Sequence, residues 1–379
     1  MARFYLGIIS LLLYLLPSLA EGQGFSAFNG RNHPYLKWME SETEHFKIIY
    51  PDRISGIEVK AASIAEETYK TLSKNLNIQF GGKIRIYLSD TDEIANGFAV
   101  PLGEGHTNIW VNLNDYIEDW TGDVKWLRKV LAHEIVHIFH FKAVRSGLGL
   151  WQFIVTDPLP SFFAEGLAQY HTEEWDAQRG DRWLRIAVFD DQLNYNDNSS
   201  IYNTRLMYAT GNSQVRFFAE QYGDSTLADL LKQRKQMLNL WKVHDFKHAF
   251  RKVTGTKYAD FEKKWQKHVN IYYNSLAMKM ERVDSLNSEK KELPGNYFFD
   301  LKHSPDNKYK ALISMPSIGR PVKQLLLIDT ETDNVVKVLA EGNINNDLAW
   351  APESDQIIYS KFVRGNKSGL LNDIFLYDM

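Results

Sequence analysis

The sequence contains no cysteine among its 379 residues. This absence excludes a disulfide framework, a cysteine-ligated zinc site, a thiol nucleophile and a lipidated N-terminal cysteine. The formal net charge is only -3 at pH 7, so the chain lacks the strongly basic character that nucleic-acid binding requires, and we expect no nucleic-acid partner. Beyond the N-terminus no apolar run is long enough to span a bilayer, which predicts a mature chain without an integral membrane span.

Residues 1–20 have the order of segments that is typical of a secretory signal peptide. An early arginine precedes an apolar run from Leu6 to Leu16, and a proline then leads to small residues that end at Ala20. An uncleaved membrane anchor is the alternative, but the run is shorter than the ~20 residues of a spanning helix. We therefore expect export to the periplasm or the cell exterior, with cleavage near Ala20.

The length and a composition of 44% hydrophobic and 24% charged residues predict a folded chain of about two domains. Aromatic residues make up 13%, which favours an aromatic-rich core and leaves a peptide- or glycan-binding surface as the alternative. After an irregular lead-in at 21–42, hydrophobic periodicity predicts strands at 45–50, 83–88 and 109–113, a loop at 97–105, and helices at 56–76, 124–142, 161–172, 206–222, 227–237 and 258–276. A strand-rich front with a mixed sheet and a helical back predict an α+β domain over residues 21–280, and not an alternating βαβ sheet.

A charged segment at 281–296 that ends in Pro-Gly-Asn predicts a linker, and an internal repeat follows it. Pro305 and Pro352 are 47 residues apart, and the two strand-like segments 324–329 and 373–378 both end in aspartate. A period in the forties with short strands is typical of β-propeller blades, and residues 297–379 resemble the TolB-like propeller repeat. That resemblance implies a partial propeller of about two blades and a possible protein partner for it. Because the second unit stops partway, we expect a longer natural protein.

The segment His133-Glu134-Ile-Val-His137 contains the pattern His-Glu-x-x-His. Histidines at positions i and i+4 lie on one helix face, about 6 Å apart along the axis, so both imidazoles can reach one metal ion. Glu134 is placed to take a proton from a metal-bound water. The rest of this helix is apolar, and buried histidines and a buried glutamate are costly unless something satisfies them. The alternative is that the two histidines are structural, and that they are buried and hydrogen-bonded to backbone carbonyls without a metal.

A third ligand is needed for a catalytic zinc, and His₂Glu is one of the known sets. The segment Phe163-Ala-Glu165-Gly-Leu-Ala-Gln-Tyr170 supplies a glutamate in the first turns of a helix, among small residues that allow close helix packing. Other candidates fit less well. His140 is about 10 Å from His133 along the axis and is expected to be structural or to support a ligand. The remaining candidates are Glu173 and Glu174, which look solvent-facing, and Asp157, which would orient a ligand histidine.

His-Glu-Ile-Val-His followed in order by Phe-Ala-Glu-Gly-Leu-Ala-Gln-Tyr resembles the gluzincin zinc metallopeptidases over residues 45–275. The resemblance implies one catalytic Zn²⁺ held by His133, His137 and Glu165, with Glu134 assisting the attack of zinc-bound water on a peptide bond. It also implies that Tyr208 stabilises the oxyanion, with a core tyrosine as the alternative reading and Tyr202 as the next candidate. Peptides or proteins are the implied substrates.

Two departures from the family pattern leave the specificity open. The 28-residue spacing from His137 to Glu165 inserts a loop at about 144–160, and no Gly-Ala-Met-Glu-Asn-like segment is present to grip a free N-terminus. The stretch 97–111 resembles only the edge strand that pairs with extended substrates. Aminopeptidase and endopeptidase action both remain open. So do a non-catalytic binding protein on a peptidase-like scaffold and a zinc hydrolase of non-peptide amides.

Overall fold

The fold is taken from a computed structural model of the chain. It describes residues 35–91, 95–112, 125–146, 159–191, 193, 204–237, 241–280, 291–316, 322–364 and 370–379. The predicted signal peptide, most of the lead-in, Asp157, Tyr202 and residues 281–290 of the predicted linker lie outside the described residues. In the part that is described, no helix has both the length and the apolar character that a membrane crossing requires.

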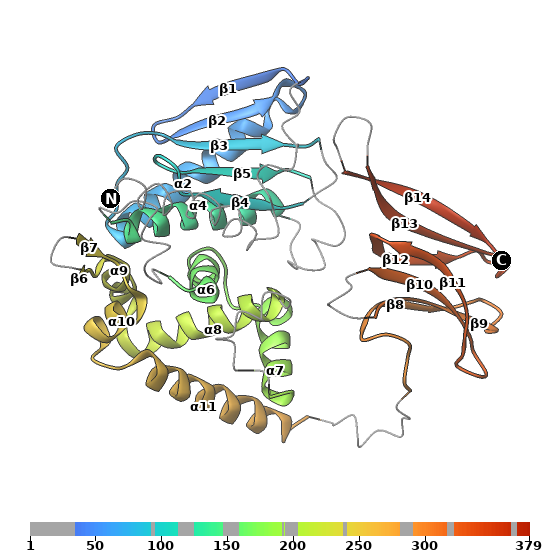
Figure 1. Cartoon of the computed structure of the whole chain (residues 1–379). Helices are drawn as coiled ribbons and strands as arrows, with labels where there is room; N and C mark the ends of the chain where they lie inside the picture. Colours follow the sequence, from blue (N-terminus) through green and yellow to red (C-terminus); the bar gives the residue numbers. More distant parts are fainter. Residues whose placement is uncertain are drawn as a thin grey trace, which may run out of the picture.

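The first half of the chain builds a five-stranded sheet with the order β1-β2-β3-β5-β4 (Figure 1). The inner pairs β2–β3 and β3–β5 are parallel, and the outer strands β1 and β4 are antiparallel to their neighbours. Alternate residues of the central strands are buried, as expected where one face of a sheet packs on a core. The strands are β1 (Trp38–Glu42), β2 (Phe46–Pro51), β3 (Ile84–Ser89), β4 (Gly97–Val100) and β5 (His106–Trp110).

Two expectations for this region were wrong. The lead-in contains β1, and the stretch 97–105, which we expected to be a loop, contains β4 (Gly97–Val100). Both are short outer strands that gain their order from pairing with a neighbour, which local periodicity does not reveal. The segment β2-α2-β3 is a single βαβ unit, because the two strands are parallel and a helix connects them, and the sheet as a whole is mixed, as expected.

Helices dominate the described part of residues 125–280, as predicted. The expected helix at 227–237 is shorter, since residues Lys235–Met237 form β6 and pair with β7 (Trp241–Val243). The helices are α2 (Ile57–Leu76), α4 (Trp126–Val144), α6 (Ser161–Thr172), α7 (Arg182–Phe189), α8 (Thr204–Tyr222), α9 (Asp224–Lys232), α10 (Phe246–Thr254) and α11 (Tyr258–Ala277), and a π-helical turn, Ala177–Asp181, precedes α7.

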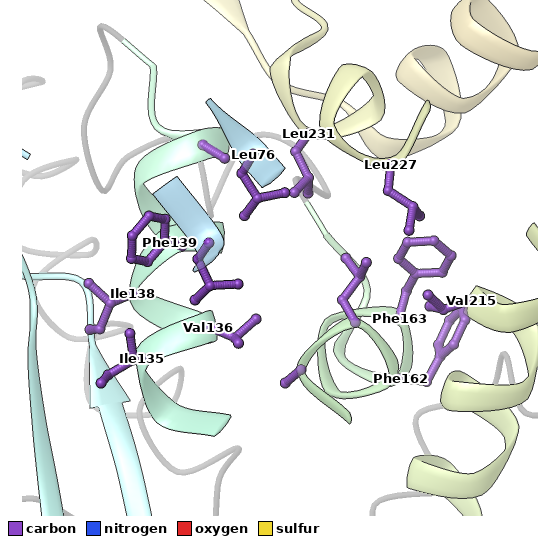
Figure 2. Packing of buried hydrophobic residues seen from close by; sticks show 14 of the residues in the cluster. Leu76, Ile135, Val136, Ile138, Phe139, Phe162, Phe163, Val215, Leu227 and Leu231 are labelled. Carbon is purple, nitrogen blue, oxygen red and sulfur yellow. The ribbon is translucent and has the colours of Figure 1, made fainter. Parts of the chain in front are cut away.

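The core surrounds α4, which is buried on nearly all sides. One side of α4 packs on the sheet and α2, and another faces α6 and α9. Figure 2 shows Val136 and Phe139 of α4 among side chains of α2, α6 and α9. Burying an apolar side chain of this size contributes roughly 1.5–3 kcal/mol. The helix that carries His-Glu-x-x-His is therefore held rigidly by its surroundings.

Two antiparallel sheets follow in the last part of the chain, where the repeat was found. The first has the order β11-β10-β9-β8 and the second β12-β13-β14, and apolar side chains of both meet in a small core of their own. The described residues do not form a closed propeller, and the partial propeller of about two blades stays a prediction. The strands are β8 (Tyr297–His303), β9 (Tyr309–Met315), β10 (Lys323–Asp329), β11 (Val335–Gly342), β12 (Ile344–Trp350), β13 (Gln356–Arg364) and β14 (Leu370–Asp378).

Candidate metal centre

Three of the predicted site residues come together in the structure. His133 and His137 lie one turn apart on α4, and Glu165 reaches them from α6. Nε2 of His133 lies 2.9 Å from Oε2 of Glu165, Nε2 of His137 lies 3.3 Å from the same oxygen, and the two nitrogens are 3.2 Å apart. The three side chains form a group that could hold a metal ion.

This triangle has the dimensions of a zinc site. Zinc binds imidazole nitrogen and carboxylate oxygen at about 2.0–2.2 Å in tetrahedral sites, so neighbouring ligand atoms are then about 3.3 Å apart. The three donor atoms therefore already lie close to the separations that one ion requires. Only three protein ligands converge among the described residues, which leaves the fourth tetrahedral position for a water or substrate atom. The donor set and its geometry fit the ion that the sequence predicts.

Charge in the site centres on Glu165. Burial works to raise the pKa of this carboxyl group, but the two imidazoles, His137 above all, hold it below its usual value. At His137 burial works to lower the pKa, yet the charge and hydrogen bond of Glu165 outweigh it and raise the pKa to about 9. At Glu134 burial dominates and raises the pKa. The apolar surroundings thus strengthen the interactions between the glutamate and histidine side chains of the site.

Tyr208 reaches the same place from α8. Its ring centroid is 6.0 Å from that of His133. Burial, the charges of Glu165 and Glu134, and a hydrogen bond to Glu165 raise the pKa of the phenol well above its ordinary value. The hydroxyl therefore stays protonated at neutral pH and can donate a hydrogen bond. Tyr208 therefore lies beside His133 and Glu165, and its oxyanion role stays a prediction.

Two glycines fix how α6 and α8 cross. A Cβ atom added at Gly211 would lie 1.9 Å from the backbone oxygen of Phe162, and one added at Gly166 would lie 2.2 Å from the carbonyl carbon of Gly211. The two helices therefore touch through their backbones. Because Gly166 directly follows Glu165 and Gly211 lies one turn after Tyr208, this contact brings those two functional side chains together.

Gln169 and Arg179 form a clamp behind the site. The Gln169 amide, oriented to satisfy both neighbours, donates to the backbone oxygen of Tyr208 at 3.0 Å and accepts from Nη2 of Arg179 at 3.0 Å. Nη1 of Arg179 also lies 2.8 Å from both carboxylate oxygens of Glu173. Glu173 is therefore buried and paired, against our expectation that it faces solvent, whereas Glu174 is exposed as expected.

His140 does not join the metal-binding group, as the spacing predicted. Its ring lies 5.8 Å from the His137 ring and 6.4 Å from the His171 ring, centroid to centroid. Among the described residues neither of its ring nitrogens has a hydrogen-bond partner. Burial lowers the pKa of His140 well below its ordinary value, so the ring is neutral and packs as a core residue.

Strand β4 passes over the site beside Glu134. A Cβ atom at Gly97 would lie 2.5 Å from Cγ2 of Val130 and 3.1 Å from Cγ of Glu134. Only glycine lets the strand approach α4 this closely. β4 is also an outer strand of the sheet among the described residues, so this edge of the sheet lies next to the predicted base.

Sequence reasoning missed Gln169, Arg179 and Gly211. Gly211 carried a usable signal, because a glycine within a helical pattern costs about 1 kcal/mol relative to alanine and usually has a packing reason. Gln169 follows Glu165 by one turn and shares its helix face. Arg179 had no local signal, since its π-helical turn and its partner Glu173 are recognised only in three dimensions.

Comparisons with known proteins give distant likenesses only. No family profile matches the sequence, and no curated protein matches it either. Among solved structures, the chain is similar to the crystal structure of Legionella pneumophila aminopeptidase A in complex with aspartic acid, with a TM-score of 0.37 and 14% identity over 90% of this chain. It is also similar to an aminopeptidase N family protein from Idiomarina loihiensis, with a TM-score of 0.35 and 12% identity, covering 90% of this chain and 69% of that one. The chain spans about a third, 36%, of the Legionella enzyme, and likeness at this level carries nothing about activity.

Proposed function

We propose that this chain is an exported zinc-dependent peptidase in which His133, His137 and Glu165 hold the metal. The observation that carries the proposal is the triangle of donor atoms, 2.9–3.3 Å apart, on two buried helices. A carboxylate and two imidazoles packed in an apolar core are costly unless they are paired or bind a metal. Export rests on the signal-peptide pattern of residues 1–20.

Glu134 is the proposed general base. When bound, zinc supplies Lewis acidity, lowering the pKa of water and polarising a carbonyl oxygen. The Glu134 carboxylate follows His133 on α4 and lies beside β4, so it can take the proton of an attacking water and return it to the leaving amine. Tyr208 donates a hydrogen bond to the oxygen that gains negative charge, which is the usual work of an oxyanion stabiliser.

Extended peptides are the proposed substrates. The edge of β4 that has no partner strand among the described residues can pair with an extended backbone by adding a strand to the sheet. Pairing of this kind would carry the scissile bond past Glu134, because β4 contacts that residue's side chain at Gly97. The proposal assigns residues 21–280 to this peptidase unit and residues 297–379 to a propeller-type unit for a partner, joined by the linker at 281–296.

The Glu134→Gln and Glu165→Gln variants test the two roles separately. Glu134→Gln should lower hydrolysis of fluorescently labelled casein by at least about 100-fold, since general-base catalysis contributes typically 10²–10⁴-fold, while zinc stays near one equivalent. Glu165→Gln should weaken zinc binding by more than about 100-fold. Loss of a residue that only supports a ligand typically weakens metal binding by about 10–100-fold, and loss of a ligand itself should cost more. Metal analysis by mass spectrometry and the casein assay, with chelator and zinc add-back, measure both.

Glu174→Gln is the matched control, because this glutamate follows the same helix but is exposed. It should keep both zinc and activity. Full casein hydrolysis by Glu134→Gln would contradict the base assignment. Unchanged zinc binding by Glu165→Gln would point to another third ligand. A wild-type chain that binds zinc but hydrolyses neither casein nor peptide libraries would contradict the peptidase proposal and leave the two alternatives, a non-peptide amide substrate or a non-catalytic binding protein.

A further inference from the structure

Positive charge is concentrated in one segment of the sequence. Residues 232–280 contain twelve lysines and arginines but only three aspartates and glutamates, which gives a formal charge of +9, whereas the whole chain carries -3. The rest of the chain is therefore acidic, with a formal charge of -12. So strong a difference in charge between parts of one chain is typical of proteins that bind an anionic surface or polymer.

α10 and α11 expose this charge to solvent. α11 packs into the core through Phe261, Trp265 and Val269, which follow one another at intervals of four residues, so the opposite side of the helix is exposed. The two helices contact each other, and Figure 1 shows α11 on the side of the helical region that faces away from the five-stranded sheet. We call their exposed side the basic face. Its exposed cations are Lys247, Arg251 and Lys252 of α10, Lys257 before α11, and Lys263, Lys264 and Lys267 of α11.

The cations of the basic face are not neutralised within the fold. In the part of the chain that the structure describes, none of the seven has a carboxylate within ion-pairing distance, whereas Lys142 beside the sheet pairs with Glu104 at 2.7 Å. Asp245 instead caps α10, accepting from the backbone N–H of His248 at 2.9 Å, and lies 3.9 Å from Lys235 outside the basic face. The seven charges repel one another, so an anionic surface that approaches them is attracted.

Apolar side chains continue the basic face toward the end of α11. Ile271, Tyr272 and Met278 are 57%, 54% and 89% exposed. Ile271 and Met278 follow Lys264 at intervals of seven residues, or about two helical turns, so the three side chains lie on one side of the helix. The basic face therefore combines unpaired cations with exposed aliphatic side chains.

We propose that the basic face docks on an anionic lipid bilayer, which the chain binds as a peripheral protein. A bilayer presents phosphate headgroups to the lysines and acyl chains to the aliphatic side chains on one extended surface. Tyr272 suits the border between these layers, because its ring is apolar and its hydroxyl is polar. Nucleic acids and acidic polysaccharides would also attract the lysines, but they offer no apolar layer to Ile271 and Met278. The contact does not involve the metal centre and goes beyond the proposed peptidase function.

Co-sedimentation with vesicles tests the proposal, with the chain from Glu21 onward so that the apolar run of the predicted signal peptide cannot contribute. The chain should bind vesicles of phosphatidylcholine mixed with phosphatidylglycerol and not vesicles of phosphatidylcholine alone, and added salt should weaken the binding. Lys264→Gln combined with Lys267→Gln should lower the affinity about 30-fold, since each cation near an anionic membrane contributes about a factor of five. Ile271→Ser should lower the affinity roughly tenfold, because a half-exposed aliphatic side chain would no longer leave water.

Two matched controls remove the same kinds of group from α2. Lys70→Gln combined with Lys74→Gln removes two exposed lysines one turn apart, and Val59→Ser removes a valine that is 67% exposed. Both should bind vesicles like the wild type, and circular dichroism checks that each variant is folded. Dextran sulfate, a polyanion without lipid, separates charge from insertion: Ile271→Ser should leave its binding unchanged.

A fluorescent label on the basic face gives a second measurement. Because the chain has no cysteine, Ile271→Cys supplies a single thiol for a polarity-sensitive fluorophore, whose emission should shift to the blue with the anionic vesicles. The same label on Val59→Cys should not shift. Absence of vesicle binding, equal binding to neutral vesicles, or equal losses in the α2 controls would overturn the proposal. Binding of dextran sulfate without binding of vesicles would also overturn it and would assign the basic face to an anionic polymer.

Discussion

Gln169 shows how a residue that does not touch the candidate metal centre can still shape it. It lies one helical turn after Glu165 on α6, and its amide holds the backbone of Tyr208 on α8. Arg179 holds the other end of that amide and is itself fixed by the buried carboxylate of Glu173. The position of the phenol is therefore set by a chain of hydrogen bonds behind the site.

The Gln169→Leu variant should lower kcat against casein by roughly tenfold, with KM nearly unchanged, because a small displacement of a catalytic group costs up to about 100-fold. Tyr208→Phe should cost more, about 10²–10³-fold, the usual loss for an oxyanion donor. The two effects should not add: in a Tyr208→Phe background, Gln169→Leu should cost nothing further.

Gln178→Leu, at an exposed glutamine of the π-helical turn, is the control and should keep the wild-type kcat. Additive losses would mean that Gln169 does not act through Tyr208.

At the residue scale, the sequence predicts the metal-capable group but not the clamp. His133, His137 and Glu165 are recognisable because a metal needs particular residue types at fixed helical spacing. Glu173 was wrongly expected to face solvent. The residues next to it in sequence do not show that Arg179 pairs with its carboxylate, since an exposed glutamate and a buried one have the same local pattern.

Two helices that touch through glycine form the most constrained contact among the elements around the site. Gly211 and Gly166 bring the backbones of α6 and α8 together. Helix axes normally lie 8–10 Å apart, depending on the side chains between them, and a glycine contact reaches the short end of that range. The separation of Glu165 and Tyr208 is therefore set by backbone atoms, which cannot move aside.

The Gly211→Ala variant tests this contact. Alanine improves helix propensity by about 1 kcal/mol, but the new methyl group would lie 1.9 Å from a backbone oxygen of α6. We expect the clash to win and the free energy of unfolding to fall by about 2 kcal/mol or more, in the range typical of overpacking. Urea unfolding measures it. Gly81→Ala, where an added Cβ has nothing within 4 Å, should be nearly neutral, and equal stability of Gly211→Ala would show that the helices can separate freely.

At the element scale, long periodic helices were predicted within about two residues, and α6 at its observed ends. The misses are β1, β4, the two short helices α7 and α10, and the end of the helix at 227–237. The missed strands are segments of three to five residues whose structure depends on pairing with a neighbouring strand. Such segments lack the length that periodicity needs, and pairing decides them instead.

At the scale of the whole molecule, the two largest cores of the described residues lie around α4 and between the C-terminal sheets. Lys323 of β10 connects the two C-terminal sheets through hydrogen bonds to β12. Its ammonium group donates to the backbone oxygen of Ile344 at 2.8 Å and to Oδ1 of Asn346 at 2.6 Å, and it lies 4.4 Å from the centroid of the Phe299 ring. Burial lowers the pKa of Lys323 to about 8.

This lysine predicts a pH dependence. Between about pH 8 and the ordinary lysine value of about 10.4, the unfolded chain binds a proton that folded Lys323 has lost, so the C-terminal sheets should become more stable as pH rises through that window. Lys323→Met should remove this part of the slope in urea midpoints measured at several pH values. Lys308→Met, at an exposed lysine of the same sheet region, should leave it. An identical slope in Lys323→Met would show that the lysine keeps its proton on folding.

The core around α4 has a practical consequence for the candidate metal centre. It draws apolar side chains from β2 near the start of the described chain through to α11, and none of that burial requires an ion. In small zinc domains the ion replaces the core, so a chelator unfolds them. Here a chelator should leave an intact scaffold behind, and the loss and return of activity can be followed on one folded polypeptide, free of any refolding step.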